Sequence, residues 1–244
     1  MSTKPDAWTL SPQLTAAPEL WRGCVIACPF WEASGTPRNI LNPKVVGTVG
    51  SPSIQLGGSG REVSFDDASY YEHGYTFPEV GLGNWNEITI ASRFINPISF
   101  SEKDALIGDR NLSSNNGWVV GVMEGSGNDG RLYVTFSGVA RYDTSTRVPG
   151  IRATKKSIVW RAVNGVSFDS FVEGELFESI NIGTLKPSGL SQNVLIGALN
   201  DSGSGSRESQ GLHEYLFVWN RALTDNEIKA LHEDPFAMLR PAGF

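Results

Sequence analysis

The chain has 244 residues, of which 40% are hydrophobic and 19% are charged, and its formal net charge is -6. A general nucleic-acid binder carries a basic patch, but here the basic residues are scattered and Lys155-Lys156 is the only Lys/Arg doublet, so we expect no nucleic-acid partner. No apolar run of about 18 residues is present, and we therefore expect no membrane span.

The N-terminal segment is interrupted by proline. Pro5, Pro12 and Pro18 oppose regular helix and central strand, and the first residues lack the apolar core of a signal peptide. We therefore expect residues 1–20 to form an arm, disordered or ordered only on a partner, and residues 21–244 to form one domain. We also expect the protein to be made and kept in the cytoplasm, or released by a route other than a signal peptide.

Short apolar runs predict a series of strands. The first convincing one runs from Gly23 to Trp31, and the alternation from Asn86 to Phe94 is typical of a half-buried strand. Asn164-Gly165 predicts a tight hairpin turn. Further strands are expected at residues 44–49, 53–56, 63–71, 105–108, 117–123, 131–137, 157–163, 168–172 and 194–199. Strands spaced by roughly 8–12 residues, without a long helical pattern, indicate an all-β sandwich.

The cysteines, Cys24 and Cys28, fall in the first predicted strand. Four residues of strand span about 13 Å, whereas a disulfide needs Cα atoms within about 7 Å. A zinc site needs four ligands, and no second pair with matching spacing is present. We therefore expect both to be buried free thiols.

The C-terminal region predicts a strand that leads directly into a short helix. Leu212 to Trp219 is apolar on both faces, as in an inner strand. Thr224 and Glu227 form the Thr-x-x-Glu pattern of a capping box, and Asp234-Pro235 ends the helix because proline cannot continue its hydrogen bonds. By alternation, the two faces of the strand are Leu212, Glu214, Leu216 and Val218 on one side and His213, Tyr215, Phe217 and Trp219 on the other.

These motifs resemble a known family. Trp219-Asn-Arg-Ala-Leu-Thr-x-x-Glu-Ile-x-x-Leu231 is similar to the last strand and closing helix of laminin-G-like, concanavalin A-like domains, and residues 234–241 resemble the version found in bacteriophage and prophage proteins. Val63 to Tyr71 resembles the Phe-Asp-Gly-x-x-x-Tyr strand of the family, and Gly23 to Gly35 its opening strand and turn. The resemblance implies a concanavalin A-like jelly-roll β-sandwich with a short C-terminal helix.

An enzyme of this fold would resemble the β-glucanases, which place carboxylates on alternate residues of one strand. The nearest match, Glu173-Gly-Glu175 with Glu178, reads as a solvated hairpin turn. No Gly-x-Ser-x-Gly elbow accompanies a histidine. We therefore expect no enzyme and no catalytic residue, including among the histidines, which are His73, His213 and His232.

Two ligands remain open as alternatives. Laminin-G-like domains often hold calcium on a loop rim, and the candidates here are Asp66, Asp67 and Asp109, although ordinary acidic turn residues explain them as well. We expect no other cofactor. A sugar site needs exposed aromatic rings beside polar groups, for which Trp85, in a Gly-Asn-Trp-Asn loop, and Tyr71 are the candidates.

The sequence therefore favours a non-enzymatic surface protein of a phage virion, assembled in the host cytoplasm. The main hypothesis is a capsid decoration (cement) protein that binds the major capsid protein as a homo-oligomer through its N-terminal arm and its C-terminal tail, Arg240 to Phe244. The alternative is a glycan-binding host-attachment module of a tail or head fibre.

Overall fold

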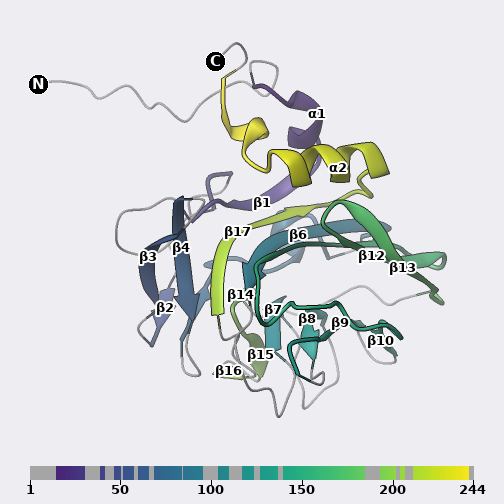
Figure 1. The fold of residues 1–244 in the computed structure, drawn as a ribbon, viewed down its shortest axis with the longest axis horizontal. Coiled ribbons are helices and arrows are strands. Elements are labelled where there is room, and N and C mark those ends of the chain that lie inside the picture. The colour runs from purple at the N-terminus through teal and green to yellow at the C-terminus, as the bar shows by residue number, and fades with distance from the viewer. Residues whose placement is uncertain are drawn as a thin grey trace, which may run out of the picture.

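The computed structural model describes residues 15–30, 39–41, 47–50, 52–57, 60–65, 69–83, 85–95, 104–109, 117–123, 127–136, 140–184, 193–201, 204–206 and 211–241. Within these residues the protein is an all-β jelly-roll sandwich of two antiparallel sheets with one longer helix near the C-terminus, as the sequence predicted (Figure 1). The helices lie together on the outer side of one sheet.

The two sheets are assembled from strands that are distant in the sequence. In the described part, an eight-stranded sheet has the order β13 (Glu175–Asn181), β12 (Ser167–Val172), β11 (Lys156–Val163), β6 (Glu87–Ile95), β17 (Gly211–Trp219), β4 (Gly60–Phe65) and β3 (Ser53–Gly57), with β1 (Cys24–Cys28) beside β17. The facing seven-stranded sheet has the order β10 (Ala140–Asp143), β9 (Arg131–Phe136), β8 (Val119–Met123), β7 (Asp104–Gly108), β14 (Leu195–Ile196), β5 (Tyr70–Glu72) and β2 (Gly47–Val49). The remaining elements are the hairpin of β15 (Leu199–Asp201) and β16 (Ser204–Ser206), helices α1 (Pro18–Trp21) and α2 (Asp225–Glu233), and 3-10 turns η2 (Pro78–Val80) and η3 (Ala237–Leu239).

Most of the predicted strands are confirmed. Those at 86–94, 105–108, 117–123, 131–137, 157–163 and 168–172 correspond to β6, β7, β8, β9, β11 and β12, with ends shifted by at most two residues. The hairpin turn at Asn164-Gly165 joins β11 to β12, with Gly165 at φ 75° as such a turn requires. Strands β10, β13 and β16 were not predicted. Strands β10 and β16 are short and mainly polar or small, and the start of β13 was read as part of a hairpin turn.

The predicted strand from Val63 to Tyr71 is wrong as a single strand. Its first part lies in β4 of the eight-stranded sheet, and its last part lies in β5 of the seven-stranded sheet. Residues 66–68 lie outside the described residues. The chain therefore changes layers within this motif, which alternation in the sequence does not reveal. Residues 194–199 divide similarly, into β14 and β15.

Strand β6 was predicted to be half-buried, and this is also wrong. Ile88, Ile90 and Phe94 face the seven-stranded sheet and belong to the inter-sheet core. The opposite face is covered as well, because Ala91 packs in a second core cluster with Tyr215 and residues of α2. The helical layer therefore buries the outer face of β6 as well, and each buried aliphatic side chain contributes about 1.5–3 kcal/mol.

A β-bulge in β17 changes which face its side chains occupy. His213 pairs with Phe94 and Tyr215 pairs with Arg93, so Glu214 is the extra residue. His213 consequently turns to the inter-sheet core, where it stacks on Phe94 at 5.3 Å, whereas Tyr215 packs in the outer cluster under α2. The strict alternation predicted for residues 212–219 is therefore wrong N-terminal to the bulge.

The closing helix has the predicted ends. Thr224 and Glu227 form both hydrogen bonds of a capping box, and Asp234 is the C-cap. Arg221 joins this helix to the N-terminal segment, because its guanidinium pairs with Glu227 at 2.7 and 2.9 Å and donates to the carbonyls of Glu19 and Arg22. The Trp-Asn-Arg-Ala-Leu motif thus contributes the contacts that seat α2 on the sheet.

Part of the predicted N-terminal arm is packed on the sandwich. Leu20 is fully buried beneath the helical layer, and its carbonyl accepts a hydrogen bond from the Trp219 indole at 2.6 Å. Thr15 forms a bridge with Pro241, so the two terminal segments lie side by side there. Residues 1–14, together with residues 242–244 of the C-terminal tail, lie outside the described residues.

Candidate functional site

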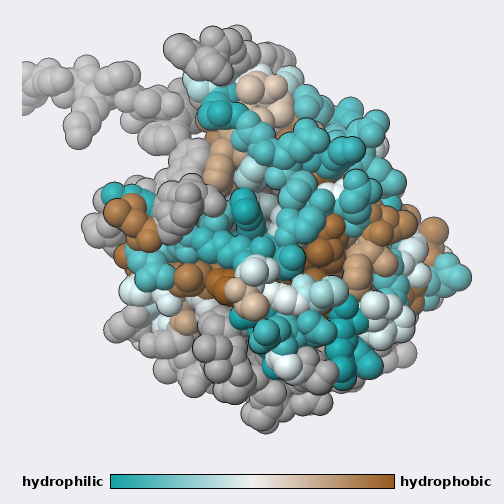
Figure 2. All heavy atoms as spheres, viewed as in Figure 1, coloured by the Kyte–Doolittle hydropathy of each residue, from teal (hydrophilic) through white to brown (hydrophobic). Residues whose placement is uncertain are grey.

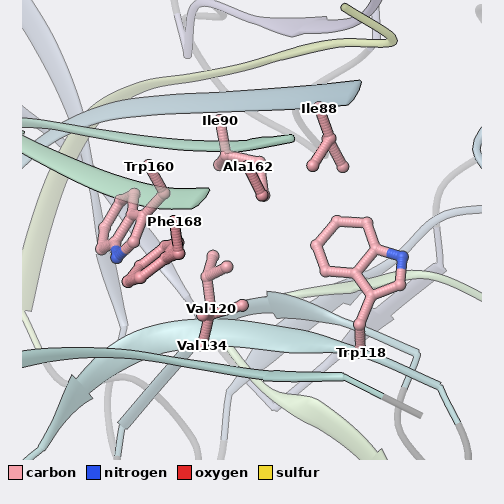
Figure 3. Close-up of a pocket in the computed structure, with 8 residues that line it drawn as sticks. All are labelled: Ile88, Ile90, Trp118, Val120, Val134, Trp160, Ala162 and Phe168. Carbon is pink, nitrogen blue, oxygen red and sulfur yellow. The ribbon is translucent and has the colours of Figure 1, made fainter. Parts of the chain in front are cut away.

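Among the described residues, the space between the sheets holds only a small apolar cavity. Eight apolar residues from β6, β11 and β12 on one side and from β8, β9 and the segment before β8 on the other line a cavity of about 10 Å³. Figure 3 shows Ile90 and Phe168 pointing toward Val120 and Val134 across this gap. A cavity of that size holds about one water molecule. The described part of the sandwich interior is therefore a packed apolar core.

The predicted calcium residues do not assemble a site in the described part of the chain. Asp66 and Asp67 lie outside the described residues. Asp109 is fully buried, and its Oδ1 accepts a hydrogen bond from the backbone N–H of Trp118 at 2.9 Å. Asp109 therefore ties the end of β7 to the start of β8. No group of three or more metal-ligating side chains occurs among the described residues.

The predicted sugar-stacking residues are buried. Trp85 is 6% exposed and Tyr71 is 2% exposed, with Tyr71 packed edge-on against Phe65. The expectation that Trp85 is exposed is wrong, because η2 and the loops around it fold that residue into the inter-sheet core. A ring that binds a sugar must offer a free face, and neither residue offers one in this structure.

Large exposed hydrophobic side chains in the described part are aliphatic. They are Leu56, Val166 and Leu176, with exposed fractions of 82%, 58% and 53%. Figure 2 shows hydrophilic residues over the helical layer and hydrophobic ones at the flanks of the sandwich. Such scattered aliphatic residues are ordinary on protein surfaces. Polar groups therefore offer the better candidate for recognition among the described residues.

The predicted hairpin turn is confirmed at Glu173 and Gly174, whereas Glu178 lies in β13 and has backbone partners. Glu173 and Gly174 occupy the turn between β12 and β13, both with positive φ. Glu178 accepts hydrogen bonds from the backbone N–H groups of Ser145 and Thr146 at 2.8 and 3.1 Å. Partial burial alone raises the pKa of Glu178, but these hydrogen bonds outweigh it and leave the pKa lowered. This carboxylate therefore joins the edges of the two sheets.

Two of the histidines lie in the apolar core. Burial lowers the pKa of His73 to about 3 and that of His213 to about 3, so both are neutral at physiological pH. The Nε2 atom of His73 lies 3.9 Å from the Sγ of buried Cys28, which is not in a disulfide. Cys24 is a free thiol and half-buried. Burial removes His73 and His213 from contact with any substrate in solution.

The most unusual polar group in the described part is a cluster of four charged residues, which we call the Lys155 cluster. Lys155 donates through Nζ to one carboxylate oxygen of Glu62 and, at 2.9 Å, to Oε1 of Glu214. The Arg93 Nε lies 3.6 Å from the other carboxylate oxygen of Glu214. The side chains of Glu62 and Glu214 are 1% and 2% exposed. Carboxylates are so deeply buried only when they are paired, as they are here.

The bulge in β17 creates this cluster. Strand β17 pairs with β4 up to His213 and with β1 from Leu216 onward, so Glu214 lies where its partner strand changes. The extra residue directs Glu214 to the same outer face as Tyr215, beside Glu62 of β4 and Arg93 of β6. Neighbouring Tyr215 is fully buried, and its hydroxyl lies 3.4 Å from Ser157 Oγ.

The two glutamates of the cluster raise the pKa of Lys155. Burial alone lowers the pKa of Lys155, but the hydrogen bonds to Glu62 and Glu214 outweigh it and raise the pKa. Lys155 is 20% exposed and Arg93 is 37% exposed, so these two side chains form the solvent-facing side of the cluster. Sequence analysis did not find the cluster, because its members lie on four segments, far apart in the chain.

No protein-family model matches the sequence, and no curated protein sequence matches it significantly. Solved structures do match the fold. Domain 4 of AbnA, an extracellular GH43 arabinanase from Geobacillus stearothermophilus solved in complex with arabinotriose, has a TM-score of 0.63 at 14% identity, over 86% of this chain and 98% of that one.

Two toxin binding domains match as well. The binding domain of Paraclostridial Mosquitocidal Protein 1 has a TM-score of 0.67 at 13% identity over 89% of this chain. Botulinum neurotoxin type C, whose cell entry is described as dependent on two ganglioside molecules, has a TM-score of 0.64 at 10% identity over 87% of this chain. The chain spans about half the length of these toxin structures, 53% and 51% respectively. At these identities the likeness shows a shared β-sandwich fold.

Proposed function

We propose that this chain is a non-catalytic carbohydrate-binding module with a concanavalin A-like fold. The observation that carries the proposal is the nearly end-to-end correspondence with domain 4 of the arabinanase, a module of similar size that was solved with an oligosaccharide. Toxin domains of the same fold, one of them described with gangliosides, add independent support. This is the glycan-binding alternative from the sequence, and it is favoured over capsid decoration.

The arrangement of the buried carboxylates in the Lys155 cluster argues against hydrolysis at this place. The paired carboxylates of Glu62 and Glu214 share the ammonium of Lys155. A glycosidase needs its two carboxylates on either side of the scissile bond, and here a lysine occupies the space between them. We therefore propose binding without hydrolysis.

A glycan array probed with the full chain at pH 7.5 tests the proposal. We expect saturable binding to a limited set of oligosaccharides and no release of reducing sugar on prolonged incubation. Absence of binding to every glycan on the array, confirmed by calorimetry with arabinotriose and with a ganglioside oligosaccharide, would refute it. Release of reducing sugar would show an enzyme instead.

Attachment to a phage virion stays a prediction from the sequence resemblance, and the comparisons give it no support. Mass spectrometry of purified particles tests it by counting copies of the protein per particle. A decoration protein would be present at a stoichiometric copy number beside the major capsid protein, and a fibre-borne glycan-binding module at a few copies. Detection only in lysate, and not in purified particles, would exclude both settings.

A further inference from the structure

Strand β3 lies at the edge of the eight-stranded sheet in the described part of the chain. It pairs with β4 on one side, and no described strand pairs with it on the other. Figure 1 shows it at the opposite end of the sheet from β13. An edge strand presents backbone N–H and C=O groups to any other strand, and proteins commonly protect such edges with charged residues or proline. Strand β3 itself, Ser53-Ile-Gln-Leu-Gly57, contains neither.

The register of β3 on β4 determines which backbone groups point outward. Gly57 pairs with Gly60 across a connection of two residues, so this closing pair must itself exchange hydrogen bonds. Hydrogen-bonded positions alternate along an antiparallel pair, and Gln55 therefore also bonds to β4. Ile54 and Leu56 consequently direct their N–H and C=O groups to the outer side of the strand, where they offer both donors and acceptors.

The side chains of β3 suit contact with another apolar strand. Ile54 and Leu56 lie on the same face, and Ile54 is half-buried against the inter-sheet core. Leu56 is 82% exposed. A single exposed leucine is ordinary, but this one belongs to an uncharged strand with outward backbone groups. That combination is typical of a strand that pairs with another chain.

The charges of the two sheet edges indicate which partner fits. Antiparallel pairing of β3 with β3 of a second copy, about a two-fold axis at Gln55, sets Ile54 opposite Leu56 of the partner subunit, and no like charges meet. The equivalent pairing of β13, whose central residue is Glu178, would set two carboxylates opposite each other, which is destabilising. A second copy paired through β3 therefore satisfies the outward groups without charge repulsion.

We propose that β3 is a homodimer interface through which two copies join their eight-stranded sheets, edge to edge, into one continuous sheet. Ile54 and Leu56 of each copy exchange backbone hydrogen bonds across the axis, and each Leu56 packs beside Ile54 of the partner subunit. A pair of five-residue strands buries less area than a standard interface, so the dimer is weak and its population depends on protein concentration. This inference is independent of the carbohydrate-binding function.

Sedimentation velocity of the full chain tests the interface between about 1 µM and about 1 mM, the range expected for a small contact area. We expect the mean mass to rise from one chain to two and to stop there. Leu56→Glu should weaken dimerisation at least about tenfold, because it brings a carboxylate into the apolar contact. Within the chain, that carboxylate lies opposite Arg61, so the monomer should fold.

Leu176→Glu is the matched control for this variant. Leu176 is the exposed leucine of the other sheet edge, β13, with an exposed fraction of 53%. Its substitution should leave the dimerisation constant within about twofold, as is usual for surface changes outside an interface.

A cross-link tests the register directly and covers the case in which Leu56→Glu fails to fold. In Gln55→Cys the two new thiols lie opposite each other at a non-hydrogen-bonded pair, where Cα atoms are about 4.5 Å apart and a disulfide fits. We expect mild oxidation to join two chains through position 55, as identified by peptide mapping, whereas Leu176→Cys should not cross-link.

Five results would overturn the interface. They are a mean mass of one chain even at about 1 mM, assembly that continues beyond two chains, undiminished dimerisation of a folded Leu56→Glu protein, loss of the dimer in folded Leu176→Glu, and failure of a folded Gln55→Cys protein to cross-link. None of these results bears on glycan binding, which is measured separately on the array.

Discussion

Acid should destabilise this protein well above the pH at which its carboxylates titrate, because two histidines are held neutral in its core. Burial lowers the pKa of His73 and of His213 from 6.5 to about 3 in each case. The unfolded chain therefore binds more protons than the folded one below pH 6.5, and stability falls as the pH falls. The contribution of the two neutral histidines to the free energy of unfolding is fully present above pH 6.5 and is lost progressively between pH 6.5 and 3.

The structure sets the size of the effect. One unit of pKa corresponds to about 1.36 kcal/mol, so at pH 5 each neutral histidine costs about 2 kcal/mol and the pair about 4 kcal/mol. Typical domains are stable by about 5–15 kcal/mol. Near pH 5.5 the free energy of unfolding should change by about 2.7 kcal/mol per pH unit when both histidines contribute. Below pH 5 the lowered pKa values of Glu178 and Glu227 act in the same direction, so the window from pH 7.5 to 5 isolates the histidines.

Urea unfolding at half-unit pH intervals measures this slope. In His213→Phe the new ring lies between Phe65 and Phe94, which already enclose the imidazole. The slope above pH 5 should fall to about 1.4 kcal/mol per unit, and adding His73→Gln should nearly abolish it. Stability at pH 7.5 serves as the control for packing damage. A His213→Phe protein with the wild-type slope would show that the core imidazole is not the source of the acid sensitivity.

Further predictions concern the contacts that seat α2 and close the β7–β8 connection, and each is read from the free energy of unfolding in urea at pH 7.5. Arg221→Ala removes the two short contacts to Glu227 and should cost about 3–5 kcal/mol; a cost below about 1 kcal/mol would contradict the assigned role. Thr224→Ala removes the N-cap hydroxyl of α2 and should lower the free energy of unfolding by about 1 kcal/mol. In the Arg221→Ala background this cost should be near zero if α2 has already detached from the sheet. Asp109→Ala leaves the buried N–H of Trp118 without its carboxylate acceptor and should cost about 1–3 kcal/mol, whereas a change in calcium dependence without a change in stability would favour a metal role.

Local chemistry made several elements predictable. The capping box of Thr224 and Glu227 needs only residues three apart, and the turn at Gly165 needs only a residue that tolerates positive φ. The strands of the inter-sheet core were found because apolar runs must be buried wherever they occur. Seventeen strands are assigned in the described part, and nearly all of the longer ones fall on predicted runs.

The errors in the prediction arose where burial depends on distant segments. Trp85 lies in a glycine- and asparagine-rich loop that reads as exposed, but the surrounding loops enclose it, leaving 6% exposed. Strand β6 reads as half-buried because α2, which covers its outer face, lies more than a hundred residues away in the sequence. Propensity and alternation describe a segment's own residues and carry no information about which other segment covers it.

The β-rich architecture, the position of most strands and both ends of the closing helix could be predicted from the sequence, because these depend on short-range periodicity and hydrogen bonding. The place where the charged groups meet depends instead on how the strands pair in the fold. Glu62, Lys155 and Glu214 come from three distant segments, and a single extra residue in β17 turns Glu214 toward the other two. A bulge changes which residues of a strand face each side of the sheet without changing the composition of the strand. The Lys155 cluster can therefore be recognised only when the pairing of the strands is known.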